Sequence, residues 1–420
     1  MTRYQAARGT QDVLPEDQKW WDYVRDAASR VARRFGYAQI ETPMFEDASL
    51  FLRGVGDTTD IVQKEMYVFE DRGGQELALR PEGTAPVCRA YLEHGMHNQP
   101  QPVRLWYTMP NFRYDRPQAG RYREHHQFGV EAIGDSDAAI DAEVVELLWR
   151  LYEEVGLTGL TLRINSIGDG ACRPAYLGAL RAYYADKLDQ VCGDCRGRYE
   201  RNPLRLLDCK NERCQAAIAS APAFVDYLCE ECADHFAKLR GYLESVAIPY
   251  EIDRRLVRGL DYYTRTVFEV QPPEEGGQSS IGGGGRYDGL IEELGGRPTP
   301  GIGFGTGIER IIINLKRQEV VLPEGDGLVV YLAYQSAPAR DVAYKLASEL
   351  RRAGVPTVLT TGERSLKSQL RHADALQARY AVIIGERELA EGTVTLKDLR
   401  DGTQEAVAMG EVAGLVNHPS

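Results

Sequence analysis

The sequence predicts an α/β (α+β) fold in two parts. The first is a mostly antiparallel sheet domain interrupted by a helical insertion, and the second is a C-terminal α/β domain with a mixed sheet. Three observations support this prediction: residues 111–131 read as two strands joined by a turn, residues 171–246 follow a helical pattern, and strands alternate with helices from residue 327 onward. We therefore place the domains at 1–325, interrupted by the insertion at 171–246, and at 327–420.

Composition limits the classes of function. The chain has 420 residues, of which 43% are hydrophobic and 27% charged, as is typical of a soluble globular protein with sizeable cores. No stretch approaches the length of a membrane span and no apolar segment follows a basic N-terminus, so we expect a cytoplasmic protein that does not interact with membranes. The formal net charge is -12. From residue 327 onward, acidic and basic residues are equal in number, so the negative net charge belongs to the residues before it. A polyanion would therefore have to bind at a locally basic surface.

The N-terminal elements are a helix and a strand. Pro15 opens a helical pattern that Gly36 ends. A strand is predicted over 37–45, although it contains Pro43. Because proline cannot donate to a ladder, this strand end lies either at a sheet edge or at a dimer interface.

A hairpin is predicted over 67–80, and it leads through a Pro-Glu-Gly-Thr segment into a helix that starts near Ala85. The exposed N–H groups of that helix start, together with Thr84, can face a ligand. Glu82 is either the partner of an ammonium group or an acid at the helix N-terminus.

The hairpin at 111–131 is the first candidate site. Side chains two apart on a strand share a face, so its return strand has a polar and an apolar face. The polar face holds Arg123, His125, Gln127, Gly129 and Glu131, and the other holds His126, Phe128 and Val130. Gly129 is expected to leave a hollow for a ligand with an amine or N–H donor. Residues 104–123 contain five Arg and one Asp, which favours phosphate binding. The alternative is an ordinary amphipathic hairpin with a solvated face.

A second candidate site follows the insertion. After a helix at 141–156 and a strand at 160–165, the sheet is expected to resume near Tyr250 with a strand over 256–263. That segment carries Arg, Asp and two Tyr. Buried strands rarely hold such residues unless these groups have partners, so the combination indicates a site.

Two glycine-rich stretches come next. Residues 281–288 allow a close approach of backbone to a ligand, and residues 301–310 read as a strand leading into a helix that begins around Gly307. The second stretch lacks the Gly-x-Gly-x-x-Gly pattern, and the chain has no P-loop motif. The Rossmann dinucleotide-binding and P-loop classes are therefore excluded.

The C-terminal domain is predicted as strands at 329–334, 355–360 and 380–385, helices at 339–352 and 365–377, and a hairpin turning at 401–402. Residues 323–327 form the linker to it.

Six cysteines cluster in the insertion as two Cys-x2-Cys pairs with a Cys-x4-Cys pair between them: Cys192, Cys195, Cys209, Cys214, Cys229 and Cys232. Paired Cys-x2-Cys motifs can form a zinc knuckle, although the interval here is longer than in the usual ribbon. Free core thiols are the alternative.

Taken together, these stretches resemble the class II aminoacyl-tRNA synthetases and, among them, the histidyl-tRNA synthetase family. The resemblance covers nearly the whole chain. The helix and strand ending at Pro43 resemble the first class motif, which forms the dimer interface, residues 112–131 resemble the second and residues 305–310 the third. Residues 258–263 and 283–287 resemble the two stretches peculiar to the histidine enzymes, which makes them the specific signal.

The resemblance implies a ligase that attaches L-histidine to its tRNA through a histidyl-adenylate, with ATP as substrate, Mg²⁺, no prosthetic group and a homodimeric state. Its partners would be histidine, ATP and tRNA(His), and its C-terminal domain would bind the anticodon. Histidine would be bound by Glu82, Gly83, Thr84, Arg113, Gln127, Glu131, Arg258, Tyr262 and Tyr263. ATP would be bound by Arg113, Asp115, Arg121, His125 and Arg310, and the loop for the tRNA acceptor end would present Arg116, Gln118 and Arg121. Arg113 and Arg258 would be catalytic, and no metal ligand is assigned among the site residues.

Two positions depart from the family pattern: Asp115 stands where Glu is usual, and His125 where a Phe that stacks on adenine is usual. A poorer stack would weaken ATP binding by about 1 kcal/mol.

The main alternative is the catalytically silent relative that serves as regulatory subunit of ATP phosphoribosyltransferase and binds histidine as effector. That relative usually lacks the C-terminal domain and departs at catalytic positions, whereas this chain keeps Glu82, Arg113, Glu131, Arg258 and Arg310. A synthetase for another amino acid is disfavoured by residues 256–263, and the class I synthetases by the absence of their motifs.

Overall fold

The computed structural model describes residues 4–56, 59, 61–118, 120–273, 280–323 and 327–416. The chain forms two compact units, Met1–Val321 and Leu322–Ser420. Most of the linker predicted at 323–327 lies outside the described residues. Among those that are described, no helix combines the length and apolar character that crossing a membrane requires.

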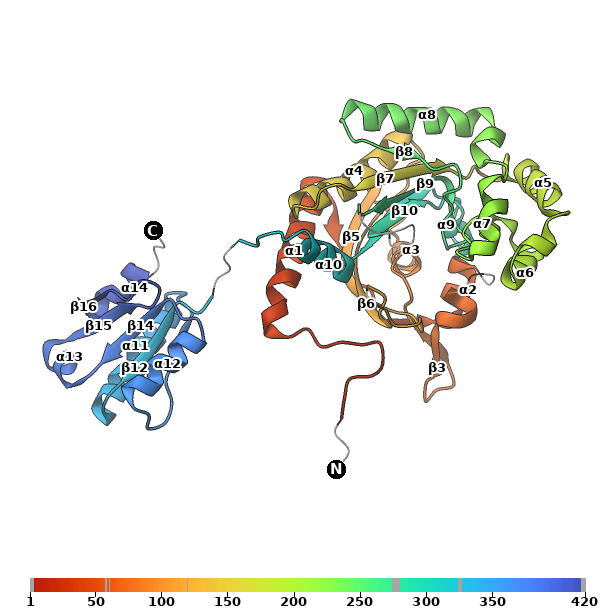
Figure 1. Ribbon diagram of the computed structural model, residues 1–420. Coiled ribbons are helices and arrows are strands. Elements are labelled where there is room, and N and C mark those ends of the chain that lie inside the picture. The colour runs from red at the N-terminus through yellow and green to blue at the C-terminus, as the bar shows by residue number, and fades with distance from the viewer. Residues whose placement is uncertain are drawn as a thin grey trace. The chain divides into compact units, whose positions relative to one another are not determined.

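The first unit is built on an eight-stranded sheet (Figure 1). Its order is β1 (Ala38–Gln39), β5 (Val103–Phe112), β6 (Glu124–Ile133), β11 (Gly301–Gly307), β10 (Gly282–Arg286), β9 (Thr264–Gln271), β7 (Thr161–Ser166) and β8 (Glu251–Ile252). The central strands pair antiparallel, and only the outermost pairs, β1 with β5 and β7 with β8, are parallel. The predicted antiparallel sheet is confirmed.

One face of this sheet is covered by helices. Those with apolar residues in its core are α1 (Pro15–Arg34), α4 (Ala138–Glu154), α8 (Glu230–Ser245) and α10 (Ile308–Arg317). Phe128 and Val130 of β6 point into this core, as the predicted alternation requires. The polar residues of the same strand therefore face the opposite side, where a second core packs residues of α3, α9 and the insertion against β5.

A small sheet flanks the large one, in the order β2 (Phe45–Asp47), β4 (Glu76–Leu79) and β3 (Tyr67–Glu70). Helix α2 (Ala48–Val55) packs on it, and α3 (Thr84–Glu93) and α9 (Leu290–Glu293) pack on α2 and on each other. The predicted hairpin at 67–80 is thus present as β3 and β4. The helix predicted near Ala85 is α3.

The insertion is helical, as predicted, and its elements are α5 (Arg173–Tyr184), α6 (Gly193–Arg201), α7 (Glu212–Ala219) and α8. Helices α5 to α7 gather at one end of the large sheet, whereas α8 packs along α4 (Figure 1).

The second unit has a five-stranded mixed sheet in the order β13 (Thr357–Leu359), β12 (Val330–Tyr334), β14 (Tyr380–Ile384), β15 (Thr393–Asp398) and β16 (Gln404–Ala408). β12 pairs in parallel with both β13 and β14, whereas β15 pairs antiparallel with both β14 and β16. Its helices are α11 (Ala337–Arg352), α12 (Leu366–Ala375), α13 (Glu386–Glu391) and α14 (Val412–Val416). The predicted α/β domain with a mixed sheet is confirmed.

Two predicted strands are wrong. The strand at 37–45 is broken, because after Gln39 the carbonyls of Thr42 and Pro43 accept hydrogen bonds from the buried guanidinium of Arg80, at 2.6 and 3.0 Å, instead of joining a ladder. Proline has no N–H with which to continue the pairing.

The second wrong strand is 256–263, which is a loop between β8 and β9. Its backbone is held outside any ladder: the Asn165 side chain donates to the Leu256 carbonyl at 2.9 Å, and the Asp261 N–H donates to the Val55 carbonyl at 3.3 Å. The polar residues that indicated a site here are therefore presented by a loop.

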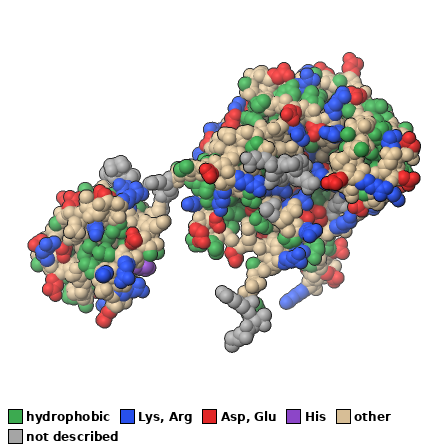
Figure 2. Space-filling view, in the orientation of Figure 1, with side chains coloured by type: hydrophobic (Ala, Val, Ile, Leu, Met, Phe, Trp, Pro, Cys, Tyr) green, Lys and Arg blue, Asp and Glu red, His purple; other side chains and the backbone are tan. Residues whose placement is uncertain are grey.

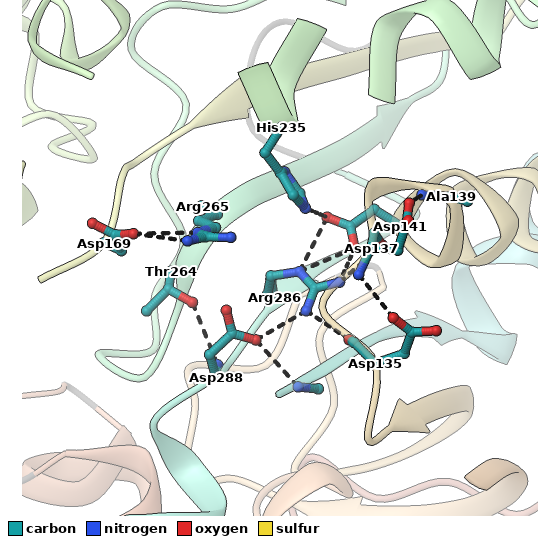
Figure 3. Close-up of polar contacts among 11 residues, drawn as sticks. Asp135, Asp137, Ala139, Asp141, Asp169, His235, Thr264, Arg265, Arg286 and Asp288 are labelled. Carbon is teal, nitrogen blue, oxygen red and sulfur yellow. Dashed lines mark hydrogen bonds and ion pairs between the residues drawn. The ribbon is translucent and has the colours of Figure 1, made fainter. Parts of the chain in front are cut away.

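A buried ion pair joins the large sheet to α4. Arg286, at the end of β10, pairs with Asp141 of α4, and neither side chain is exposed (Figure 3). The same guanidinium donates to the Asp135 carbonyl at 2.9 Å and to Asp288 at 3.0 Å, and His235 of α8 lies 3.5 Å from Asp141. The acceptors around this cation thus come from two places, the turn that leads into α4 with the first turn of that helix, and the turn after β10.

We expect Asp141→Asn to lower the free energy of unfolding by about 3 kcal/mol, because it leaves the Arg286 charge buried without its main partner. Urea-induced unfolding measures this change. The matched control is Glu154→Gln on the same helix, whose ion pairs with Arg30 and Arg34 are solvent-exposed and worth less than about 1 kcal/mol. Equal losses in the two variants would contradict the role given to the buried pair.

Candidate active site

A cavity of about 790 Å³ opens on the face of the large sheet opposite α1, α4, α8 and α10. Its walls come from β6, β10 and β11, from the start of α3, from the loop at 256–263 and from the insertion around α6. Most of the predicted site residues line it together: Glu82, Gly83, Thr84, Arg113, Asp115, Arg121, His125, Gln127, Arg258, Tyr262, Tyr263 and Arg310. Glu131, Arg116 and Gln118 are not among the lining residues.

Glu131 lies beneath the cavity, fully buried, and its carboxylate accepts three hydroxyl hydrogen bonds. These come from Thr84 at 2.9 Å, Tyr107 at 3.0 Å and Tyr287 at 2.6 Å. All three donors line the cavity. Burial raises the pKa of Glu131 from 4.5 to about 8, with a further upward contribution from Glu82, even though the hydroxyls lower it. The carboxyl therefore titrates near neutral pH.

The expected hollow over Gly129 is filled, which corrects that prediction. A Cβ built on Gly129 would lie 2.4 Å from the ring of Tyr107, its register partner on β5. Gly303 of β11 plays the matching part on the other side, since a Cβ there would lie 1.9 Å from the Glu131 carboxylate. The glycines thus make room for Tyr107 and Glu131 rather than for a ligand.

Glu82 stands at the start of α3, where its carboxylate accepts from the N–H groups of Thr84 and Ala85, both at 2.8 Å. This is the helix-N-terminal role that the sequence left open. The carboxylate also lines the cavity, with the Tyr262 hydroxyl 3.5 Å away. Burial raises the pKa of Glu82, and the two backbone N–H groups lower it in part.

Three arginines around the cavity are held by oxygen atoms of the chain. Arg113 donates to the Pro81 carbonyl at 2.7 Å, and Arg258 pairs with Glu269 at 2.9 Å. Arg310 donates to the Gly120 carbonyl at 3.0 Å and contacts the Ser280 carbonyl. Each guanidinium is therefore oriented before any ligand arrives, which is the arrangement that favours binding of phosphate or carboxylate.

Of the two unusual positions, Asp115 lies in the loop between β5 and β6 and His125 lies at the start of β6. Asp115 lies 3.5 Å from Arg121, and the backbones of Gln118 and Arg121 bond to each other in the turn. Burial, with Arg113 and Arg310 nearby, lowers the pKa of His125 well below 6.5. His125 is therefore neutral at physiological pH.

Charges of both signs are interspersed around the cavity. Figure 2 shows the same mixture on the face of the first unit that it draws. Among the lining residues, Asp194, Asp208 and Glu269 stand with Arg198 and Lys210. The cavity is thus suited to a ligand with both anionic and cationic groups rather than to a polyanion alone.

Sequence reasoning missed several lining residues. Tyr107 could have been found, because the hairpin register sets it opposite Gly129, and a large ring opposite a glycine is a sign of close packing. Tyr287 follows the glycine-rich β10 directly. Asp194 and Arg198 of the insertion gave no signal, because nothing local in a helical stretch indicates which wall it forms.

The cysteines of the insertion do not form one cluster. Cys192, Cys195, Cys209 and Cys214 form one group, and Asp169, Cys172, Cys229 and Cys232 form another. The two Cys-x2-Cys motifs are therefore in different groups, which corrects the expected pairing.

Comparison with known proteins agrees with this geometry. Residues 9–311 match the family model described as histidyl-tRNA synthetase, and residues 319–418 match the model described as anticodon binding domain. A curated relative from Dehalococcoides mccartyi, named histidine–tRNA ligase, is 55% identical over 97% of this chain and 98% of its own length.

Two solved structures are also similar. The apo histidyl-tRNA synthetase of S. aureus gives a TM-score of 0.85 at 36% identity, covering 99% of this chain and 100% of that one. A Bacillus halodurans chain, described as an ATP phosphoribosyltransferase regulatory subunit/histidyl-tRNA synthetase, gives a TM-score of 0.68 at 25% identity, covering 92% and 99%.

The titration of Glu131 makes stability depend on pH. Because its pKa is raised in the folded state, folding takes up a proton, and the stabilisation present below pH 4.5 is lost as the pH rises to about 8. We expect this residue to lower the free energy of unfolding of the ligand-free protein by about 1.4 kcal/mol per pH unit in that window. Urea unfolding at a series of pH values, with Glu131→Gln as the reference, measures it. A constant difference between the two proteins would mean that Glu131 is ionised throughout.

Proposed function

Since the chain belongs to the histidyl-tRNA synthetase family, we propose that this cavity activates histidine with ATP and passes the histidyl group to tRNA. The observation that carries the proposal is the buried Glu131 carboxyl, surrounded by hydroxyl donors, beside three arginines that are already oriented.

Histidine fits the cavity by its own donors and acceptors. An imidazole N–H would replace one of the hydroxyl donors on Glu131, and the Tyr263 hydroxyl would bond to the second ring nitrogen. The α-ammonium group would bind near Glu82, Thr84 and Gln127, with Gly83 and Tyr262 completing the pocket. A site of paired donors and acceptors rejects amino acids that leave them unpaired, by about 10⁴-fold.

The first step would be an in-line attack of the histidine carboxylate on the α-phosphorus of ATP, with pyrophosphate as leaving group. Arg113 and Arg258 would hold the carboxylate and the α-phosphate, stabilising the charge that develops between them. No covalent bond to the protein is needed. The histidyl group would then pass from the adenylate to the terminal ribose of tRNA.

ATP would also contact the loop between β5 and β6 and the start of α10. Arg310 would stack on adenine and reach the γ-phosphate, and neutral His125 would offer a second stacking surface. Asp115 and Arg121 would complete this side. Mg²⁺ would arrive with ATP and neutralise phosphate charge, and Glu269, a carboxylate lining the cavity beside Arg258, fits its preference for oxygen ligands.

For tRNA we propose two contacts. The loop with Arg116, Gln118 and Arg121 would meet the acceptor end, and the unit at 327–420 would read the anticodon through base edges. The insertion at 171–246 would remain part of the catalytic domain at 1–325.

We also propose a cytoplasmic homodimer. The small sheet and the residue before β2 expose four apolar side chains, those of Met44, Phe45, Val68 and Phe69. The rings of Phe45 and Phe69 contact each other. Such a group of exposed apolar side chains is typical of a surface that a second subunit covers. It adjoins the broken strand at Pro43.

The regulatory-subunit alternative is less supported. Curated relatives named histidine–tRNA ligase align over nearly the full chain, including the C-terminal unit. In addition, Arg310 is assigned to ATP rather than to histidine, so a protein that only binds histidine would not require this arginine to be held in a fixed orientation.

The direct test is amino-acid-dependent ATP–pyrophosphate exchange without tRNA. We expect exchange with histidine and with none of the other nineteen amino acids, because only an imidazole satisfies both Glu131 and Tyr263. Histidine binding without exchange would instead favour a regulatory role.

Arg258→Ala tests the catalytic assignment. We expect the rate constant of adenylate formation to fall about 10²- to 10³-fold, with a much smaller change in the dissociation constant for histidine, because the guanidinium acts on the developing charge. Single-turnover kinetics and calorimetric titration separate the two quantities. The control is Arg254→Ala, an exposed arginine a few residues earlier. Parallel loss of binding and rate would mean that Arg258 only anchors the substrate.

A further inference from the structure

The insertion contains two groups of side chains whose potential ligand atoms converge. In the first, the four sulfur atoms of Cys192, Cys195, Cys209 and Cys214 all lie within 4.8 Å of one another. Two of the separations are 3.8 Å, between Cys192 and Cys209 and between Cys195 and Cys214.

These distances match a tetrahedral metal site. Zinc–sulfur bonds of about 2.3 Å in a regular tetrahedron place the sulfur atoms about 3.8 Å apart. A disulfide requires about 2.0 Å, so the same geometry does not describe bonded cystine pairs. Most of these thiols are buried in a hydrophobic core, but apolar packing alone does not require four sulfur atoms to converge on one point.

The local backbone also fits thiolate ligands. The Cys192 N–H donates to the sulfur of Cys214 at 3.2 Å, and the Asn211 N–H donates to the sulfur of Cys209 at 3.5 Å. Bonds of this kind orient the ligands and offset the negative charge of thiolates around a divalent ion. Two short loops, Cys-x2-Cys and Cys-x4-Cys, supply the ligands as in a knuckle.

We propose that Cys192, Cys195, Cys209 and Cys214 bind a structural zinc ion. Sulfur-only tetrahedral sites suit zinc or iron, and a closed site in which the protein fills all four positions is the structural type. The site forms one wall of the active cavity.

This wall reaches the catalytic loop through two contacts. Cys192 and Cys209 themselves line the cavity. Between them in sequence, Asn202 donates to Asp261 at 2.8 Å and Arg205 donates to the Arg258 carbonyl at 3.4 Å. The metal would therefore fix the segment against which the loop at 256–263 rests.

The second group carries an independent proposal of the same kind. One ligand atom each from Asp169, Cys172, Cys229 and Cys232 lies within 4.8 Å of the others. Asp169 points one carboxylate oxygen toward Cys172, 3.7 Å from its sulfur. The other oxygen accepts from Arg265 at 3.1 Å (Figure 3). A carboxylate oriented by an arginine in this way is a typical metal ligand with outer support. This zinc ion would join the first residues of the insertion to the start of α8.

Metal analysis of the purified full-length protein tests both sites without reference to activity. We expect two zinc ions per chain. Cys195→Ala should lose one, Cys232→Ala should lose the other, and the control Cys88→Ala, a buried cysteine in α3 outside both groups, should keep two. Zinc content unchanged in Cys195→Ala overturns the first site, and zinc content unchanged in Cys232→Ala overturns the second. Iron in place of zinc would overturn the choice of metal.

If the variants fail to fold, a second measurement on the wild-type protein tests both sites. Wild-type protein stripped by a chelator and reloaded with Co²⁺ should show tetrahedral d–d bands and thiolate-to-metal charge transfer, whose intensity reports the number of sulfur ligands. A cobalt spectrum without charge transfer overturns both sites.

The proposed effect of the first zinc site on the cavity rests on the proposed function, and it is tested by a separate measurement. We expect Cys195→Ala to raise the KM for ATP or histidine in pyrophosphate exchange several-fold, with Cys88→Ala unchanged. Zinc loss with no change in KM would overturn the link but leave the metal site standing.

Discussion

The guanidinium of Arg286 connects the large sheet to the helix that covers it. It is enclosed by Asp141, by Asp288 and by backbone carbonyls, so it can be accommodated only if α4, β10 and the turn after β10 all hold their places. Burial alone lowers the pKa of such a group, but the two carboxylates raise the pKa of Arg286 above its ordinary value, which keeps the cation charged inside the protein. The buried ion pair therefore fixes the positions of the β10 glycines and of the Tyr287 ring at the cavity.

The floor of the cavity shows how one buried carboxyl can organise several strands. Glu131 comes from β6, its hydroxyl donors come from α3, from β5 and from the residue after β10, and Gly303 of β11 leaves space for it. The low polarity that raises its pKa also strengthens each of these hydrogen bonds. Replacing water by fixed hydroxyls means that little reorganisation is needed when a nitrogen ligand arrives.

Much of this fold could be predicted from periodicity and turn chemistry. The hairpin of β5 and β6, the helical insertion and the C-terminal alternation of strands and helices are all local patterns, and they are confirmed. The failures at 37–45 and 256–263 have long-range causes. Arg80 takes the carbonyls that a strand at 37–45 would have used, and Asn165 and Val55 bind the backbone of 256–263.

The candidate site was predictable to the extent that its residues lie in recognisable stretches. The polar face of β6 and the start of α3 were assigned correctly to one region of space. Tyr107 was missed because its importance depends on the pairing of β5 with β6 at Gly129, and the insertion's wall was missed because sequence gives no distance between a helix and a remote loop.

The insertion leads from β7 to β8, which is its parallel neighbour in the large sheet. Parallel neighbours need a crossover connection of a dozen or more residues, so some of the insertion is required by the sheet itself. Helix α8 supplies that part, since Phe236, Leu239 and Leu243 are buried in the main core. Helices α5 to α7 are additional to the crossover, and they are the part of the insertion that contributes a wall to the cavity.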